Sequence, residues 1–221
     1  MYVSRRILMY QKPVFSDRAQ AGLALADEVK ALNLRDCVVI GLPRGGVPVA
    51  AEVARAIEAP LDVIVVRKLG LPEQPEVGFG AIGEDAVQVL NPEIVGAVGL
   101  TQAQIDEIAS KEKRFLQNRV LQIRALYPEV PLRNKTVVIV DDGIATGIDA
   151  RAACRVAKAR GATRVILAVP VAPWNWQRRL SSEADDFITV IEANNLRAVG
   201  EFYEDFAPVE DEEMLSYLNE N

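Results

Sequence analysis

Short apolar segments recur along the chain, separated by longer stretches with helical spacing. The apolar segments are five to seven residues long, rich in valine and isoleucine, and do not alternate with polar residues. Such segments are typical of strands that are covered on both faces of a parallel sheet. The pattern therefore predicts an α/β fold with a central, mostly parallel twisted sheet flanked by helices. The predicted strands are residues 37–42, 61–66, 136–140, 164–170 and 187–191.

The stretches between these segments predict helices that link the strands through right-handed crossovers. A further helix is expected to start at Thr101, a good N-cap, and to run to about residue 126 with one apolar face. Pro128 and Pro131 would end it. Asn91 and Pro92 predict a shorter helix just before it. The remaining predicted helices are residues 17–32, 47–56 and 149–160.

Residues 77–90 have a different pattern, in which two short apolar pieces, 79–82 and 87–90, flank Gly83, Glu84 and Asp85. This arrangement predicts a β-hairpin at the sheet edge. The sequence contains no repeat, low-complexity tract or long linker. We therefore expect a single domain over residues 1–221, with its core at about residues 15–195.

Charge and composition exclude several classes of protein. The chain has 25 basic and 31 acidic residues, a net charge of −6, which is a poor match for a partner as acidic as nucleic acid. It has no run of eighteen apolar residues, and its first residues lack the apolar region of a signal peptide. We therefore expect no nucleic-acid or membrane partner and a cytoplasmic location.

The chemistry open to the protein is limited by its lack of histidine. Nucleophilic triads with a histidine base and HExxH zinc sites are excluded. Cys37 and Cys154 lie far apart among apolar neighbours, which indicates buried packing residues and no disulfide or thiolate metal site. Any reaction must therefore use carboxylates, amides, cations or a bound metal.

The strongest functional signal lies at residues 137–150, where an apolar strand ends in Asp141 and Asp142 and continues through two glycines into a helix. Ligands bind at this edge of a parallel sheet. Successive backbone N–H groups and the helix N-terminus form an anion site, which suits a phosphate. The Walker lysine is missing, and paired carboxylates suit vicinal hydroxyls better than a second phosphate. An acidic strand-turn-helix without a ligand is the alternative.

This segment resembles the signature of type I phosphoribosyltransferases, which bind phosphoribosyl pyrophosphate (PRPP). The resemblance implies that Asp141 and Asp142 hold the ribose hydroxyls. Asp149 departs from the family, which usually has Ser or Thr at this position, and its carboxylate would repel a phosphate dianion or cap the helix instead. The resemblance assigns the 5′-phosphate to the intervening loop, formed by Gly143, Ile144, Ala145, Thr146 and Gly147.

The turn at residues 41–46 follows the first predicted strand and carries Arg44, Gly45 and Gly46. It resembles the pyrophosphate loop of the same family, which implies that Arg44 contacts the pyrophosphate and that the glycines permit close approach. The family often has a non-proline cis peptide here, which would fall near Pro43 and Arg44. An ordinary Gly- and Pro-containing turn is the alternative.

Arg67 and Lys68 close the next predicted strand and lead into a stretch containing Pro72, Pro75 and Gly78. The composition of that stretch predicts a mobile lid and no packed structure. The family similarly carries a flexible loop here, which implies that both cations complement the charge of the departing pyrophosphate. Two solvated cations at a strand end are the alternative.

Two aromatic segments follow the phosphate loop. Trp174 and Trp176 open a possible helix and could stack on a base, although core packing is the commoner role for such residues. Phe202, Tyr203 and Phe206 precede a short acidic helix. In the family, a small hood formed by N- and C-terminal segments selects the acceptor, and these residues could line it or pack as a docking arm.

Most of the chain resembles a bacterial group of phosphoribosyltransferases whose acceptor is not evident from sequence. The resemblance implies transfer of a phosphoribosyl group from PRPP to a nitrogenous base, with Mg²⁺ as cofactor held mainly by pyrophosphate, ribose hydroxyls and water, and no protein side chain is assigned as a metal ligand. We expect a homo-oligomer, most simply a dimer. Two alternatives are a PRPP-binding regulator with little turnover and an interaction protein that uses the helix at residues 101–126.

Overall fold

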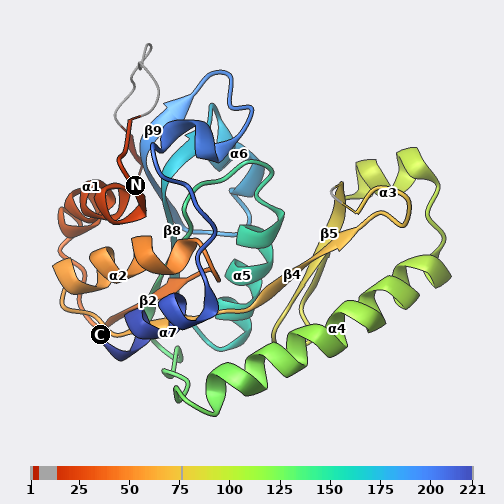
Figure 1. The fold of residues 1–221 in the computed structure, drawn as a ribbon, viewed down its shortest axis with the longest axis horizontal. Helices are drawn as coiled ribbons and strands as arrows, with labels where there is room; N and C mark the ends of the chain where they lie inside the picture. Colours follow the sequence, from red (N-terminus) through yellow and green to blue (C-terminus); the bar gives the residue numbers. More distant parts are fainter. Residues whose placement is uncertain (1, 5–13, 76, 221) are drawn as a thin grey trace.

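The computed structural model describes residues 2–4, 14–75 and 77–220, and a parallel sheet runs through its centre (Figure 1). Within these ranges the strand order is β1-β9-β8-β7-β2-β3. The five predicted strands all form, and an additional strand, β1, pairs with β9. The strands of this sheet are β1 (Tyr2–Ser4), β2 (Cys37–Gly41), β3 (Leu61–Val63), β7 (Thr136–Val140), β8 (Arg164–Pro173) and β9 (Asp186–Ala193).

Side chains on both faces of the central strands are buried, as their uninterrupted apolar sequence predicts. In β7, Val138 and Val140 join a core cluster with helices α1, α2 and α7. Val137 and Ile139, on the opposite face of the same strand, join a second cluster with α5 and α6. The helices are α1 (Arg18–Lys30), α2 (Gly46–Ala56), α5 (Ile148–Ala159), α6 (Trp176–Leu180) and α7 (Asp211–Asn219), with a 3₁₀ turn at Val199–Phe202.

An arm projects from this core (Figure 1). The hairpin predicted at residues 77–90 forms, but not at the edge of the main sheet, because it pairs with β4 in a separate antiparallel sheet. Asn91 and Thr101 cap the two helices of the arm as predicted, and Gly99 ends the first of them in the left-handed conformation. The elements of the arm are β4 (Val66–Gly70), β5 (Gly78–Gly83), β6 (Gln88–Leu90), α3 (Pro92–Val98) and α4 (Gln102–Arg124).

The strand predicted at residues 61–66 is divided between the two sheets. It leaves the main sheet after Val63, and the backbone N–H of Val65 donates to the carboxylate of Glu84 at 2.7 Å. Glu84, which is 4% exposed, also accepts a hydrogen bond of 2.8 Å from Arg160 at the end of α5. A buried carboxylate with two donors holds the crossing segment in place, and with Arg160 it ties the arm to the core.

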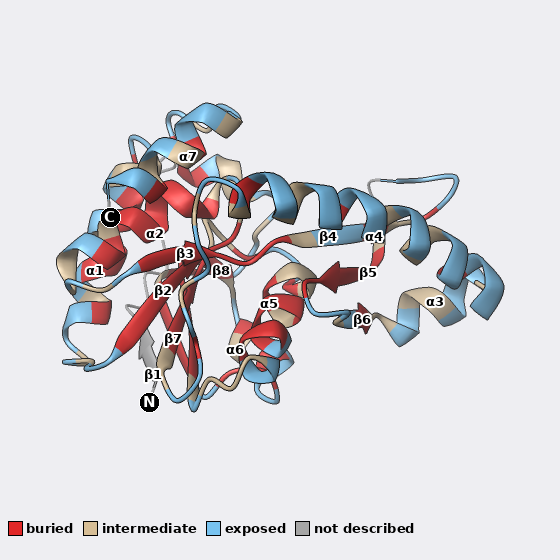
Figure 2. Ribbon diagram, turned by 90° about the horizontal axis from the view of Figure 1, so that it is seen from below, coloured by how far each residue is buried: buried red, intermediate tan, exposed pale blue. Residues whose placement is uncertain are grey.

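Helix α4 lies along the arm, and much of its surface is exposed (Figure 2). Its buried residues, Ile105, Leu116 and Ile123, recur at helical spacing, so the predicted apolar face is confirmed. Cys37 and Cys154 are both buried, also as predicted. In the described part of the chain, α4 and the other helices are too short or too polar to cross a bilayer.

Candidate functional site

The two loops that carry the glycine motifs leave neighbouring strands at the same edge of the sheet. Gly41 of β2 is in register with Val140 of β7, and the N–H of Leu42 donates to the carbonyl of Val140 at 2.9 Å. Because β2 and β7 are parallel, the residues that follow them continue side by side. Residues 41–46 and 141–147 therefore form one site from distant parts of the sequence.

Contact between the loops is possible only because two residues lack side chains. A Cβ atom on Gly46 would lie 2.8 Å from the Cα of Asp141, and one on Gly45 would overlap the carboxylate of Asp142. The peptide between Pro43 and Arg44 is cis, as predicted. Gly45 and Gly46 thus place the predicted pyrophosphate loop directly against the two acids.

The carboxylate of Asp142 is held by residues that the sequence motifs did not indicate. Arg18, in the first turn of α1, donates from Nε to Oδ2 of Asp142 at 2.9 Å. The same guanidinium donates to the carbonyl of Ala207 at 2.8 Å and lies 4.0 Å from the centre of the Phe206 ring. Burial raises the pKa of Asp142, and Arg18 opposes this change. Asp142 is therefore fixed in direction by an ion pair.

Asp141 has a different environment. Its Oδ1 accepts the backbone N–H of Asp142 at 2.9 Å. Burial raises the pKa of Asp141 well above its usual range, and the neighbouring carboxylate of Asp142 adds to this. The two adjacent acids are thus unequal, with Asp142 charge-paired and Asp141 the more readily protonated.

The predicted phosphate loop combines an anchored part with an exposed part. Ile144 is buried, and its N–H donates to the carbonyl of Val171 in β8 at 2.9 Å, so it holds the loop and does not present itself to a ligand. Ala145 and Thr146 are exposed. Gly147 has φ of +78° at the start of α5, a conformation that favours glycine. The exposed segment at the helix N-terminus is the part suited to an anion.

Asp149 lies in the first turn of α5, close to this segment. Its Oδ1 is buried and accepts no hydrogen bond from the described residues, so the capping role considered from the sequence is not seen for that oxygen. Burial raises the pKa of Asp149, and the charge of Lys68 lowers it in part. A poorly solvated carboxylate therefore stands where a phosphate would be expected.

A pocket of about 570 Å³ adjoins the Pro43–Arg44 turn and brings together two of the predicted pyrophosphate residues, Arg44 and Arg67. Arg119 of α4 lines the same pocket and was not indicated by any motif. It pairs with Asp211 at the start of α7 through contacts of 2.6 and 2.7 Å. Nothing in the local sequence of α4 distinguishes Arg119 from the other basic residues of that helix.

Arg67 and Lys68 are expected at the end of the strand predicted at residues 61–66, and the structure places them within a separate strand of the arm. Arg67 and Lys68 lie in β4, which pairs with β5, and Leu69 is fully buried. Arg67 forms an ion pair with Glu112 of α4 at 2.6 Å. Neighbouring strand residues point to opposite faces, so Lys68 is directed away from Arg67, on the side where its charge acts on Asp149.

The aromatic segments pack into the structure. Trp176 is 1% exposed and meets the edge of Phe187 in the core, so it has the packing role that is the commoner expectation and is not placed to stack on a base. Trp174, in contrast, is 37% exposed. Phe202 and Tyr203 are buried beside Phe15, which supports the alternative of a packed docking arm. The segment that contains Tyr203 is also part of the site, because the hydroxyl of Tyr203 donates to the carbonyl of Asp142 at 2.6 Å.

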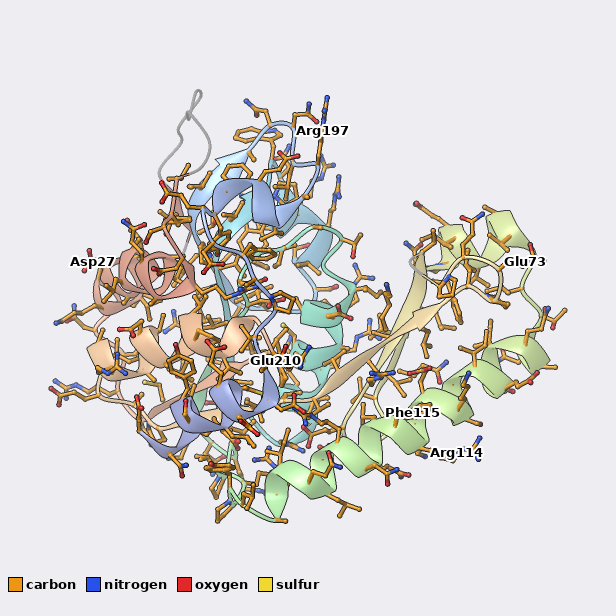
Figure 3. All side chains as sticks on the ribbon, in the orientation of Figure 1. Asp27, Glu73, Arg114, Phe115, Arg197 and Glu210 are labelled. Carbon is orange, nitrogen blue, oxygen red and sulfur yellow. The ribbon has the colours of Figure 1, made fainter. Side chains whose placement is uncertain are left out.

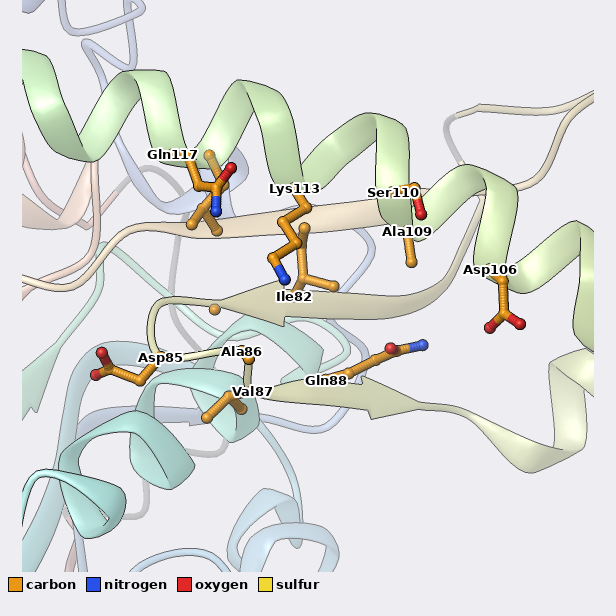
Figure 4. A pocket seen from close by; sticks show the side chains of 12 residues that line it. Ile82, Asp85, Ala86, Val87, Gln88, Asp106, Ala109, Ser110, Lys113 and Gln117 are labelled. Atoms are coloured by element: carbon orange, nitrogen blue, oxygen red, sulfur yellow. The ribbon is translucent and has the colours of Figure 1, made fainter.

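Another pocket, of about 300 Å³, lies in the arm between α4 and the β5–β6 hairpin (Figure 4). Lys113 of α4 points toward the hairpin, and Gln88 extends from β6 on the opposite side. None of the predicted site residues lines this pocket. The motifs and the pocket of the arm are thus separate features.

Comparison with known proteins gives a consistent picture. The sequence matches the phosphoribosyl transferase domain over residues 19–205. The chain belongs to the phosphoribosyl transferase family. The matched range includes the two glycine loops and α4, and ends just before α7.

Two proteins from Mycobacterium tuberculosis strains CDC 1551 / Oshkosh and ATCC 25618 / H37Rv, provisionally named phosphoribosyl transferases, are each 47% identical over 206 residues. The match covers 93% of this chain but only 46% of each relative, so the chain spans about half the length of these relatives. A crystal structure of TT1426 from Thermus thermophilus is 39% identical, with a TM-score of 0.79. It matches over 94% of this chain and 98% of that chain. This chain therefore shares its fold with a solved structure of similar size.

Proposed function

We propose that this chain transfers the 5-phosphoribosyl group of PRPP to a ring nitrogen of a nucleobase-like acceptor and releases pyrophosphate. The observation that carries the proposal is the contact of Gly45 and Gly46 with Asp142 and Asp141. It brings a cationic turn, two carboxylates and a helix N-terminus to one sheet edge. These groups match the pyrophosphate, the ribose hydroxyls and the 5′-phosphate of one substrate.

Each part of the site has a role in this proposal. Asp141 and Asp142 accept hydrogen bonds from the ribose hydroxyls, and the ion pair with Arg18 keeps Asp142 in position. The loop of Gly143, Ile144, Ala145, Thr146 and Gly147 binds the 5′-phosphate, with Ile144 acting as an anchor. Arg44 binds pyrophosphate together with Gly45 and Gly46, and Arg67 and Lys68 add positive charge.

The proposed reaction needs charge stabilisation more than a strong base. The bond between the anomeric carbon and the pyrophosphate oxygen breaks through an oxocarbenium-like state, and the acceptor nitrogen forms the new bond. The electron pair leaves with pyrophosphate, and the acceptor loses its N–H proton to water. Orientation and neutralisation of the leaving group account for such a step, so a site without histidine is adequate.

Mg²⁺ is part of the proposal as a cofactor that the substrate helps to hold. The described residues contain no group of three or more acidic or cysteine side chains suited to a metal ion. Asp141 and Asp142 supply hard oxygen atoms, which fit a magnesium ion whose other ligands come from PRPP and water. When bound, the ion would offset the negative charge of the pyrophosphate.

Asp149 supports a second candidate function, a PRPP-binding regulator with little turnover. A buried carboxylate with an unsatisfied oxygen at the start of α5 disfavours tight binding of a phosphate dianion. A regulator would tolerate weak or slow binding better than an enzyme. The acceptor-selecting hood, a homodimer and a cytoplasmic location belong to the proposal in either case.

Two measurements test the proposal. Titration calorimetry with PRPP and Mg²⁺ should show binding to the wild type and a loss of about tenfold or more for the double variant Asp141→Asn, Asp142→Asn. An unchanged affinity of this variant for PRPP would contradict the assignment of Asp141 and Asp142 to the PRPP site. A panel of purines, pyrimidines and orotate with PRPP should then release pyrophosphate for at least one acceptor. Binding without release across the panel would favour the regulator.

A further inference from the structure

Three arginines from separate elements converge on the pocket beside the Pro43–Arg44 turn. Arg44 follows β2, Arg67 lies in β4, and Arg119 projects from α4. Each of them contacts a carboxylate of the protein itself. Arg67 pairs with Glu112, Arg119 pairs with Asp211, and Arg44 lies 3.4 Å from both Glu210 and Asp211.

Asp211 has the central position among these contacts. Its Oδ1 accepts from Arg119 Nη2 at 2.6 Å and from Arg44 Nη1 at 3.4 Å, while its Oδ2 accepts from Arg119 Nη1 at 2.7 Å. One carboxylate thus bridges two guanidinium groups. Arginines bind phosphate oxygens in the same bidentate manner, so the arrangement of Arg44 and Arg119 around this carboxylate would also suit a phosphate.

We propose that Arg119 joins Arg44 and Arg67 as a pyrophosphate-binding side chain in this pocket, and that Glu210 and Asp211 compete with the ligand for these arginines. This inference rests on the proposed function. Arg119 shares a carboxylate oxygen with Arg44, so an anion that replaces Asp211 there meets both guanidinium groups. Arg67 lines the same pocket and completes a cluster of three positive charges.

The position of Asp211 allows the exchange without loss of the fold. Its side chain is 50% exposed, and that of Glu210 is 77% exposed, so both can turn toward solvent. Helix α7 stays attached through Met214 and Leu218, which are buried in the core. Only side chains at the beginning of α7 have to move. Glu210 precedes the helix and is labelled at that position in Figure 3.

An internal carboxylate lowers the apparent affinity for an external anion, because the ligand must first displace it. This predicts opposite effects for the two partners of one ion pair. Loss of Arg119 removes a binding group, whereas loss of the Asp211 charge removes a competitor. A purely structural ion pair would not give effects of opposite sign.

Calorimetry of the whole chain with inorganic pyrophosphate tests the inference. We expect Arg119→Gln to bind about tenfold more weakly than the wild type, and Asp211→Asn to bind severalfold more tightly. Arg114→Gln and Glu212→Gln are matched controls. Arg114 extends outward from α4 (Figure 3) and does not line this pocket, and Glu212 is an exposed neighbour of Asp211. Both should bind like the wild type.

Glu210→Gln provides a second variant that leaves the Arg119–Asp211 pair intact, and it should also tighten binding. Wild-type affinity in Arg119→Gln would overturn the assignment of Arg119. Affinities no higher than wild type in both Asp211→Asn and Glu210→Gln would overturn the role of the carboxylates. The PRPP titration of the Asp141 and Asp142 variants decides the proposed function separately, because neither acid contributes to this pocket.

Discussion

Arg18 donates from its Nε to the carboxylate of Asp142 at 2.9 Å, although the two residues are 124 positions apart in the sequence. The side chains of Arg18 and Asp142 are only 11% and 15% exposed. The ion pair joins α1 to the loop that follows β7, and it sets the direction of one of the two acids. In the proposed function, Arg18 is therefore a positioning residue.

Replacement of Arg18 should weaken the site without removing a direct ligand contact. We expect Arg18→Gln to reduce PRPP affinity by about tenfold, because Asp142 loses both its orientation and its charge partner. Calorimetry with Mg²⁺ measures the effect, and the exposed Arg35→Gln serves as the control. Equal affinity in Arg18→Gln and wild type would show that the ion pair is not needed for binding.

Asp141 and Asp142 should have opposite effects on stability. Asp142→Asn leaves the shielded Arg18 without its counter-charge and should lower the free energy of unfolding by about 2 kcal/mol. Asp141→Asn removes a partly buried carboxylate with a raised pKa and should increase the free energy of unfolding by about 0.5–2 kcal/mol. Urea denaturation near neutral pH measures both changes. Loss of stability in Asp141→Asn would contradict the environment described for this acid.

The pH dependence of the Asp141 effect provides an independent check. The pKa of Asp141 in the folded state is raised above the usual 3.8, so ionisation of this group destabilises the folded protein. Below about pH 3.8 the group is protonated in both the folded and the unfolded state, and there is no such destabilisation. The cost appears as the pH rises from about 3.8 through the higher folded-state pKa. The stability difference between Asp141→Asn and wild type should therefore widen with rising pH and level off once the acid is ionised.

Asp149 should limit phosphate affinity. We expect Asp149→Thr to bind PRPP about three- to tenfold more tightly, because it removes a buried negative charge and adds a hydroxyl donor. Asp149→Asn separates the two effects, since it removes the charge without adding a hydroxyl group. The comparison uses calorimetry with Mg²⁺. Weaker binding in both variants would mean that the carboxylate itself contributes to the site.

Glu183 should contribute pH-dependent stability away from the site. Hydrogen bonds of 2.8 and 3.0 Å from Arg155 lower the pKa of this carboxyl group, although burial opposes the change. The stabilisation is present above the unfolded value of about 4.5 and is lost as the pH falls through the lower folded-state pKa.

At neutral pH, Glu183→Gln should reduce the free energy of unfolding by about 1–2 kcal/mol. The exposed Glu107→Gln on α4 should change it by less than about 0.5 kcal/mol. Urea denaturation at about pH 7 and about pH 3.5 measures both. A Glu183→Gln effect of the same size at both pH values would contradict the titration of this group.

The local sequence predicts those elements of this protein that depend on interactions between residues close together in the chain. The strand before Asp141, the cap at Thr101 and the hairpin around Gly83 follow from periodicity and from backbone preferences of particular residues. The residues that contact the site from elsewhere in the chain do not follow from local sequence. Arg18, Arg119 and Tyr203 reach it from distant elements, and no spacing rule connects them with Asp142 or Arg44.

The division of the chain between two sheets could not be predicted from local sequence either. Residues 61–66 form one continuous strand pattern, yet the chain leaves the main sheet after Val63, and Glu84 accepts the N–H of Val65. A buried carboxylate nineteen residues away decides this break. For the same reason, β4 is not visible in composition alone, because its packing depends on β5 and α4, which come later in the sequence.

The ion pair between Arg160 and Glu84 connects the C-terminal end of α5 to the arm, while the N-terminal end of α5 lies at the candidate site. The first turn of the helix adjoins the exposed loop of Ala145 and Thr146, and its last turn holds the crossover from which Arg67 extends. A helix is stiff along its axis, so a small displacement at one end is transmitted to the other. Helix α5 is thus a rigid connection between the loop proposed to bind the 5′-phosphate and the crossover that leads to Arg67, so in the proposed function the two ends of one substrate would lie at opposite ends of a single helix.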